Sequence, residues 1–158
     1  MEDESSAHAY RIQKINEIQK DIEKERDKRV VLSRRYQRGV SVVDGINTAL
    51  VLAAAGFGAS TIIAAPIAMS LGSIALATAP LIYVAAQIAK KLSLKREKHE
   101  KIKTLAEAKL STINDLVSKA LNDGYISDGE FSLIICELGK FNDKKEEITK
   151  KSYVIDEE

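Results

Sequence analysis

The order of apolar and charged residues divides the chain into three parts. Residues 10–41 alternate charged and aliphatic residues at the three-and-four spacing that is typical of an amphipathic helix. Between Gly45 and Ala89 there is no charged residue, and the charges return at Lys90. The pattern predicts an all-α protein in which a central apolar helical hairpin is flanked by long amphipathic helices.

The apolar segment is long enough to cross a bilayer twice, because one helical pass takes about 20 apolar residues. We predict a transmembrane hairpin with spans at 42–63 and 67–89 and a turn near residues 64–66. Pro66 supports this turn, because proline suits the first turn of a helix and disfavours helical geometry in the residue before it.

Two features modify the predicted hairpin. Pro80 lies inside the second span and is predicted to kink it, a cost that neighbouring helices relieve in membrane proteins. The alternative turn is at Gly56-Phe57-Gly58, which would leave the first span shorter than a bilayer needs.

The flanking sequences predict further helices. Arg26 and Arg29 interrupt the isoleucine stripe of residues 10–41, so this helix is predicted to pack against the C-terminal helices, with self-association as the alternative. Ser127 and Glu130 have the spacing of a capping box, which predicts a helix start. The predicted regions outside the hairpin are a disordered acidic N-terminus at 1–9, amphipathic helices at 10–41 and 90–122, a turn at 123–127, a C-terminal helix at 128–150 and an acidic tail at 151–158.

Basic residues gather immediately outside both ends of the apolar segment. The cytoplasmic flanks of membrane spans carry such an excess, so two spans with both termini in the cytoplasm satisfy the pattern. A helix that is apolar all round can also be a fully surrounded core helix. The alternative is therefore a cytoplasmic helical bundle that buries the hairpin in its core. The basic residues are Arg34, Arg35, Arg38, Lys90, Lys91, Lys95 and Arg96.

Small residues recur at helical spacing within the apolar segment. Such residues let two helix backbones approach closely, which favours association where no hydrophobic force acts between spans. We therefore predict that they pack the two halves of the hairpin or contact a further copy of the chain. The predicted packing residues are Gly56, Gly58, Ser60, Ala68 and Gly72.

Composition narrows the possible chemistry. The 158 residues leave room for one domain or for a hairpin with helical flanks, and the net charge is +1. Cys136 is the single cysteine, and His8 and His99 are far apart in the sequence, so no metal site, cofactor site or catalytic group is predicted. Acidic residues interleave with basic ones, so nucleic acid is not an expected partner, and no small-molecule substrate is identified.

Residues 123–131 resemble the second half of an EF-hand calcium loop. The first and third ligand positions of such a loop would fall on Lys119 and Leu121, which supply no side-chain oxygen. We therefore predict a turn between helices at this place.

The layout of an amphipathic helix, a Gly/Ala-rich apolar hairpin at 45–89 and a charged helical tail resembles known membrane hairpins. Similar hairpins occur in colicin pore domains, in apolipoprotein-L-like proteins and in the two-span SLATT type. Residues 60–66, 109–113 and 128–131 also resemble uncharacterised proteins encoded in invertebrate genomes, some of them near mobile elements. These resemblances imply no established activity and no role for a particular residue.

Together these features predict a two-span membrane protein that inserts its hairpin and associates through it, as a membrane-permeabilising or scaffolding oligomer. The expected partners are the lipid bilayer and further copies of the chain. The alternative is a soluble helical-bundle interaction module that binds partners through its amphipathic flanks. An enzyme is not expected, because no acid, base or nucleophile has the spacing that catalysis requires.

Overall fold

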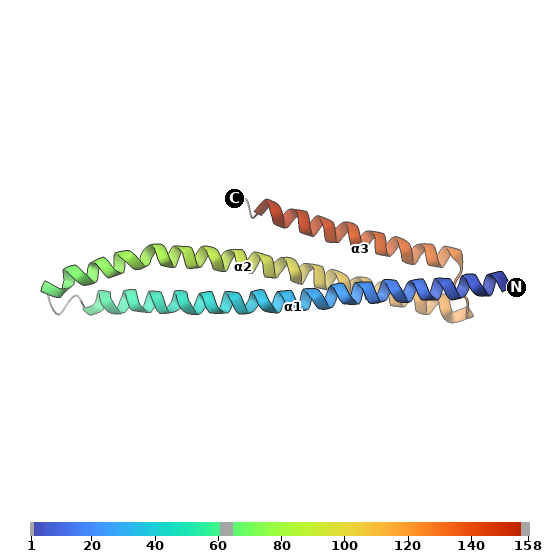
Figure 1. The fold of residues 1–158 in the computed structure, drawn as a ribbon, viewed down its shortest axis with the longest axis horizontal. Helices are drawn as coiled ribbons and strands as arrows, with labels where there is room; N and C mark the ends of the chain where they lie inside the picture. Colours follow the sequence, from blue (N-terminus) through green and yellow to red (C-terminus); the bar gives the residue numbers. More distant parts are fainter. Residues whose placement is uncertain (1, 61–64, 156–158) are drawn as a thin grey trace. The chain divides into compact units, whose positions relative to one another are not determined.

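The protein is described by a computed structural model, which covers the backbone of residues 2–60 and 65–155 and the side chains of residues 5–53, 79–122 and 124–151. The backbone forms three α-helices and one short 3-10 helix, and the described residues contain no strand (Figure 1). The prediction of an all-α protein is therefore confirmed. The elements are α1 (Glu2–Ser60), α2 (Ala65–Ala120), η1 (Leu121–Asp123) and α3 (Asp128–Ile155).

Helix α1 is continuous from Glu2 to Ser60, so the amphipathic sequence and the first apolar stretch belong to one helix. It begins earlier than the start near residue 10 that the sequence pattern predicts. The acidic residues at positions 2–4 favour this early start, because negative charge near a helix N-terminus interacts well with the helix dipole. The helix includes residues 56–58, so the alternative turn at those glycines is not formed.

Helix α2 is continuous from Ala65 to Ala120 and contains Pro80 in its interior. Pro66 lies in its first turn, where a missing backbone N–H costs nothing because that group has no partner within the helix. The predicted turn near residues 64–66 includes Ala64, and residues 61–64 lie outside the described part of the chain.

The chain divides into two compact units. Unit 1 contains Met1–Ser33 and Glu97–Glu158, and unit 2 contains Arg34–Arg96. In unit 1 the first part of α1, the second part of α2 and α3 share one hydrophobic core. The core members are Ile15, Ile18 and Ile22 from α1, Ala106, Leu110, Ile113 and Ala120 from α2, Ile126 from the α2–α3 connection, and Ile134 and Phe141 from α3.

The isoleucine stripe of α1 is the side that faces this core. Ile22 is 1% exposed, and Ile12 packs at the edge of the cluster. This confirms the prediction that the N-terminal helix packs against the C-terminal helices of the same chain. A fully buried isoleucine stabilises a fold by about 1.5–3 kcal/mol relative to leaving it exposed. Burial of the stripe therefore accounts for much of the stability of unit 1.

The connection between α2 and α3 is held by local hydrogen bonds. Gly124 ends η1 in the left-handed region with φ 77°, a conformation that glycine adopts without steric cost. The backbone N–H of Ser127 donates to Glu130 Oε2 at 2.9 Å, and the N–H of Glu130 donates to Ser127 Oγ at 3.3 Å. These reciprocal bonds confirm the predicted capping box at the start of α3.

Candidate interaction surface

In unit 2, segments of α1 and α2 lie side by side. A Cβ atom placed on Gly39 of α1 would lie 3.3 Å from Cδ1 of Leu92 of α2. The backbone of α1 at Gly39 therefore lies against the side chain of Leu92, and residue 39 is level with residue 92. This register determines which residues of the two helices share the same height.

Seven basic side chains surround this point of close approach. Because residue 39 is level with residue 92, the basic residues that follow Ser33 and those that follow Ala89 share a band about 10 Å deep along the helix pair. All seven are exposed, and the ion pairs found among the described residues involve other lysines and arginines. We call this set the basic collar: Arg34, Arg35, Arg38, Lys90, Lys91, Lys95 and Arg96.

The collar gives unit 2 a strongly positive charge. Its seven basic residues are opposed by one acidic residue, Asp44, so the net charge of unit 2 is +6. The other 17 basic and 22 acidic residues belong to unit 1, whose net charge is −5. The overall charge of +1 therefore hides a large difference between the two units.

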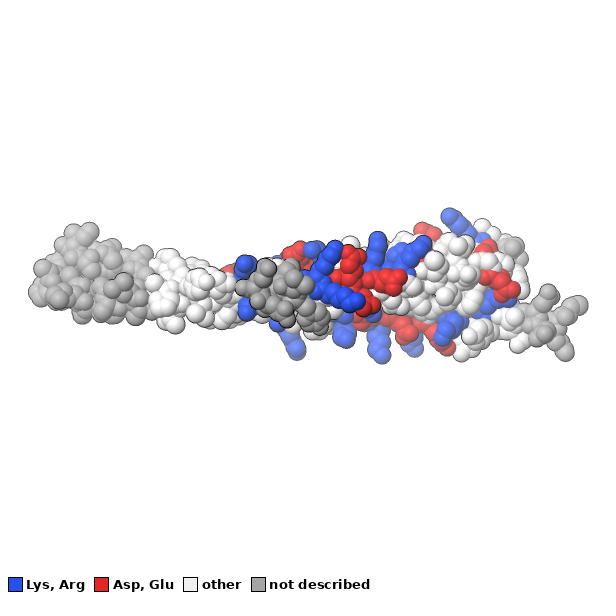
Figure 2. All heavy atoms as spheres, turned by 90° about the horizontal axis from the view of Figure 1, so that it is seen from above, with Lys and Arg blue, Asp and Glu red and all other residues white. Residues whose placement is uncertain are grey.

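Next to the collar, large apolar side chains of unit 2 are exposed to solvent. Leu52 is 66% exposed and Val84 is 52% exposed, whereas Ala85 is buried. Figure 2 shows the described residues 45–53 and 79–89 as a surface without charged atoms. Monomeric proteins rarely expose contiguous apolar patches of large size, so this exposure calls for an explanation. We call it the apolar surface: Val42, Ile46, Val51, Leu52, Leu81, Tyr83, Val84 and Ile88.

A polar group also lies within this apolar part of α1. The side-chain oxygen of Asn47 is buried and has no hydrogen-bond partner among the described residues. An unsatisfied buried acceptor costs about 1–3 kcal/mol.

Among the described residues, no helical stretch has both the length and the apolarity needed to cross a membrane. Residues 54–78 form the middle of the uncharged run, and their side chains lie outside the described part of the chain. The predicted packing contacts of the hairpin lie there as well. The residues concerned are Gly56, Gly58, Ser60, Ala68 and Gly72.

Unit 1 contains a buried polar layer that the sequence analysis did not single out. Arg29 donates from Nε to Glu25 at 2.9 Å, and its Nη1 lies 3.1 Å from Nδ1 of His99. Ser33, which is 2% exposed, donates to Glu100. The isoleucine stripe of α1 could have indicated this layer. Residues three or four positions apart lie on the same face of a helix, and such steps from Ile22 lead to Glu25, Arg29 and Ser33.

The environment of this layer shifts two pKa values. Burial lowers the pKa of His99, and the positive charge of Arg29 lowers it further. Burial by itself would raise the pKa of Glu25, but the hydrogen bonds and charge of Arg29 outweigh it and hold this pKa below its usual range. The layer is therefore most stable with a neutral imidazole and an ionised carboxylate.

A second polar cluster attaches the start of α1 to the α2–α3 connection. Arg11 donates to the hydroxyl of Tyr125 at 2.8 Å and to the carbonyl of Ile126 at 2.6 Å, and it forms an ion pair with Asp128. The ring of His8 stacks on Tyr125 with centroids 5.0 Å apart. These contacts are structural, since they connect the chain's own helices across unit 1.

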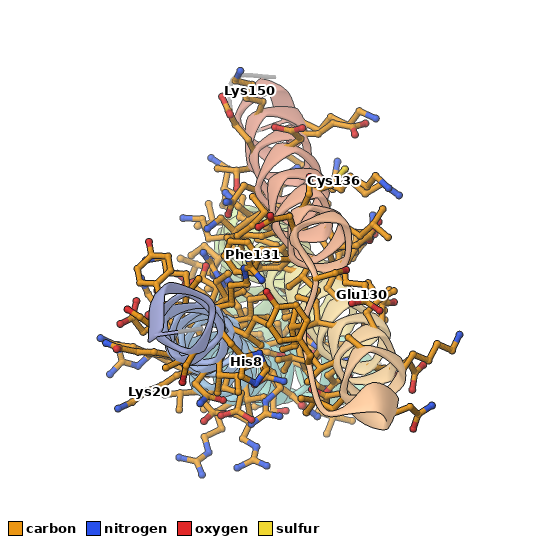
Figure 3. All side chains as sticks on the ribbon, turned by 90° about the vertical axis from the view of Figure 1, so that its right-hand side faces the viewer. His8, Lys20, Glu130, Phe131, Cys136 and Lys150 are labelled. Atoms are coloured by element: carbon orange, nitrogen blue, oxygen red, sulfur yellow. The ribbon has the colours of Figure 1, made fainter. Side chains whose placement is uncertain are left out.

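Metal-binding groups are not assembled in the described residues. No group of three His, Cys, Asp or Glu side chains there could hold a metal ion. In Figure 3, Phe131 points toward the neighbouring helices and Cys136 points away from them, and the thiol of Cys136 is exposed. What the described chain offers is a folded helical base and an exposed surface.

The fold places the chain among all-α proteins built on long helices, and two viral proteins are similar to it in sequence. It is 26% identical to "Uncharacterized protein 259R" of Invertebrate iridescent virus 6 over 147 aligned residues. These aligned residues make up 93% of the chain and 49% of the viral protein. It is 31% identical to "Uncharacterized protein 071L" of Invertebrate iridescent virus 3 over 123 aligned residues. These aligned residues make up 77% of the chain and 56% of the viral protein. The chain thus spans about half the length of these relatives.

No protein-family model matches the chain, and no solved structure matches it. The similarities support a relationship to uncharacterised proteins of viruses that infect invertebrates. They do not extend to the colicin, apolipoprotein-L-like or SLATT types, so those resemblances concern the layout of the sequence alone.

Proposed function

We propose that this protein is a helical association module. Unit 1 is the folded base, and unit 2 binds a partner through its apolar surface. The observation that carries the proposal is the exposure of eight large apolar side chains on neighbouring segments of α1 and α2. Fully burying an exposed Val, Leu or Ile side chain contributes about 1.5–3 kcal/mol, so covering the exposed part of several of these side chains would help offset the entropic cost of association.

The test replaces two of these side chains by serine in the whole 158-residue chain. Leu52→Ser combined with Val84→Ser is expected to weaken association without loss of helix, because both side chains are exposed in the chain itself. Sedimentation velocity measures binding to further copies, vesicle flotation measures binding to a bilayer, and circular dichroism measures helix content.

The matched control replaces two equally exposed apolar residues of unit 1, Val31→Ser with Leu133→Ser. This control is expected to associate like the original protein. The proposal is wrong if the Leu52 and Val84 variant associates as strongly as the control, or if the original protein is a monomer that leaves vesicles unbound.

Two kinds of partner fit an apolar surface, and they correspond to two functions. A protein partner or a second copy would make the chain a soluble interaction module. A bilayer would make it a two-span hairpin protein with both termini in the cytoplasm, able to act as a scaffold or to permeabilise the membrane as an oligomer. The second function is supported by the uncharged run from Gly45 to Ala89 and by the basic residues that flank it.

Carbonate extraction of cells that express the whole chain separates the two functions. Recovery in the membrane pellet is expected for an inserted hairpin, whereas recovery in the supernatant without detergent is expected for an interaction module. Dye release from vesicles then tests permeabilisation, and vesicles that stay intact at high protein load contradict it.

A further inference from the structure

We infer that the basic collar binds the phosphate groups of an anionic lipid bilayer while the adjacent apolar surface faces the hydrocarbon. The inference rests on the proposed association through unit 2 and names the partner of that surface. It depends on the register of the two helices, which the sequence does not reveal.

The contact between Gly39 and Leu92 brings both basic clusters into one band about 10 Å deep along the helix pair, since Lys90 comes level with residue 41 and Arg96 with residue 35. The collar is therefore a single positive layer on two neighbouring helices. Lys and Arg side chains near a membrane surface extend their charged ends to the phosphates while their carbon stems lie along apolar groups. Seven such side chains in a band about 10 Å deep can extend their charged ends to the phosphates of one bilayer surface.

The spacing between the collar and the apolar surface matches the structure of a bilayer. Arg38 and Val42 are separated along α1 by about 6 Å, at 1.5 Å per residue. The headgroup layer on one side of a bilayer is about 5–7 Å thick, because a core of about 30 Å lies within a total of about 40–45 Å. Arg38 at the phosphates would therefore place Val42 at the edge of the hydrocarbon.

A shallow depression on α1 lies where the collar meets the apolar surface. It has a volume of about 570 Å³ and is open to solvent. Its lining combines guanidinium groups with neutral polar and apolar groups, a mixture that fits a lipid headgroup above its first methylene groups. The lining residues are Arg34, Gln37, Arg38, Ser41 and Val42.

The charge of unit 2 favours anionic over neutral lipid. The collar is opposed in unit 2 only by Asp44, and the collar side chains make no ion pairs with described residues. Nucleic acid also offers phosphates, but it would contact the collar alone and leave the apolar surface in water. A bilayer satisfies both regions at once.

The experiment measures flotation of the whole chain with vesicles of phosphatidylcholine alone or of phosphatidylcholine mixed with phosphatidylserine. Tight binding to the mixed vesicles is expected, and it should weaken at high salt, which screens exposed charges. Arg34→Gln with Arg35→Gln and Arg38→Gln should weaken this binding on the order of 100-fold, from the contribution of each basic residue near an anionic surface.

The matched control removes the same charge from unit 1, with Lys20→Gln, Lys119→Gln and Lys144→Gln, all at exposed positions. It should bind the mixed vesicles much more tightly than the collar variant does. Circular dichroism verifies that both variants keep their helices.

Each contrary result identifies what failed. Equal binding to neutral and mixed vesicles overturns the headgroup inference and leaves the proposed association intact. Self-association without flotation overturns the bilayer as partner, again leaving association through unit 2. Equal losses in the collar variant and the control overturn the inference, and so does tighter binding of the collar to duplex RNA than to vesicles.

Discussion

At the scale of single residues, the polar layer of unit 1 shows how burial changes the chemistry of ordinary side chains. His99 is 8% exposed, and its Nδ1 faces a permanently charged arginine. Lys28 and Lys98 add positive charge nearby, and Glu25 opposes them with negative charge. The neutral imidazole accepts a hydrogen bond from Arg29, whereas a protonated ring would place two cations in contact.

This arrangement predicts that the protein loses stability as the pH falls. The pKa of His99 is lowered in the folded state, so the unfolded chain binds the proton more readily. The free energy of unfolding should therefore decline below about pH 6.5, with a slope of at most about 1.4 kcal/mol per pH unit from this group. Urea unfolding followed by circular dichroism between pH 8 and pH 5 measures the slope.

His99→Gln provides the control for this prediction, because its amide keeps an acceptor for Arg29 and does not titrate. The slope between about pH 6.5 and pH 5 should become flatter in this variant. An unchanged slope would show that another group is responsible. The contribution of Glu25 belongs to a lower range, since its pKa is depressed and its stabilisation is lost only as the pH falls below about 4.

At the scale of the elements, local sequence signals and helix boundaries agree best where side chains bond to the backbone. The start of α3 was predictable because Ser127 and Glu130 satisfy each other's backbone N–H groups. The start of α1 was less predictable, because an acidic segment of low hydrophobicity gives no periodic signal of its own.

The capping box predicts a measurable stability difference. Ser127→Ala removes the acceptor of the Glu130 N–H and should destabilise the protein by about 0.5–2 kcal/mol. Ser132→Ala, at an exposed position inside α3, is the matched control and should change stability by less than about 0.5 kcal/mol. Thermal unfolding compares the two variants, and equal effects would argue against a capping role for Ser127.

At the scale of the whole molecule, the division into two units separates two kinds of surface. Unit 1 has an apolar core shared by three helices, and its charged side chains pair with one another in several places. Unit 2 has an apolar surface, a positive collar and few buried side chains among its described residues. The stable core and the proposed association surface thus belong to different parts of one chain.

The pairing of α1 and α2 in unit 2 can be tested at its closest point. Gly39→Leu should separate the two segments, because even a Cβ at this position comes within 3.3 Å of Leu92. Gly45→Leu is the matched control, since nothing lies within 4 Å of a Cβ at Gly45. The rate of disulfide formation between cysteines introduced at positions 43 and 88, each one helical turn from this contact, reports the pairing in a chain that keeps Leu92 and carries Cys136→Ser. It should fall in the Gly39 variant and remain in the control, and equal rates would contradict the register.

The sequence by itself determined the all-α class, the core-facing stripe of α1 and the capping box of α3. These features depend on residues close together in the chain, whose spacing is read directly from helical geometry. The sequence also indicated basic residues at both ends of the apolar run. Only the tertiary structure decided that these residues form one collar, because the register of α1 against α2 depends on the approach of Gly39 to Leu92.

The polar layer required the tertiary structure for the same reason. Arg29 and His99 are distant in sequence, and periodicity alone cannot say which residue of α2 faces a given residue of α1. The exposure of the apolar surface was likewise decided by packing, since an uncharged helix fits a protein core and a bilayer equally well. Local spacing determines a helix and its apolar face, whereas contacts between distant segments determine what that face meets.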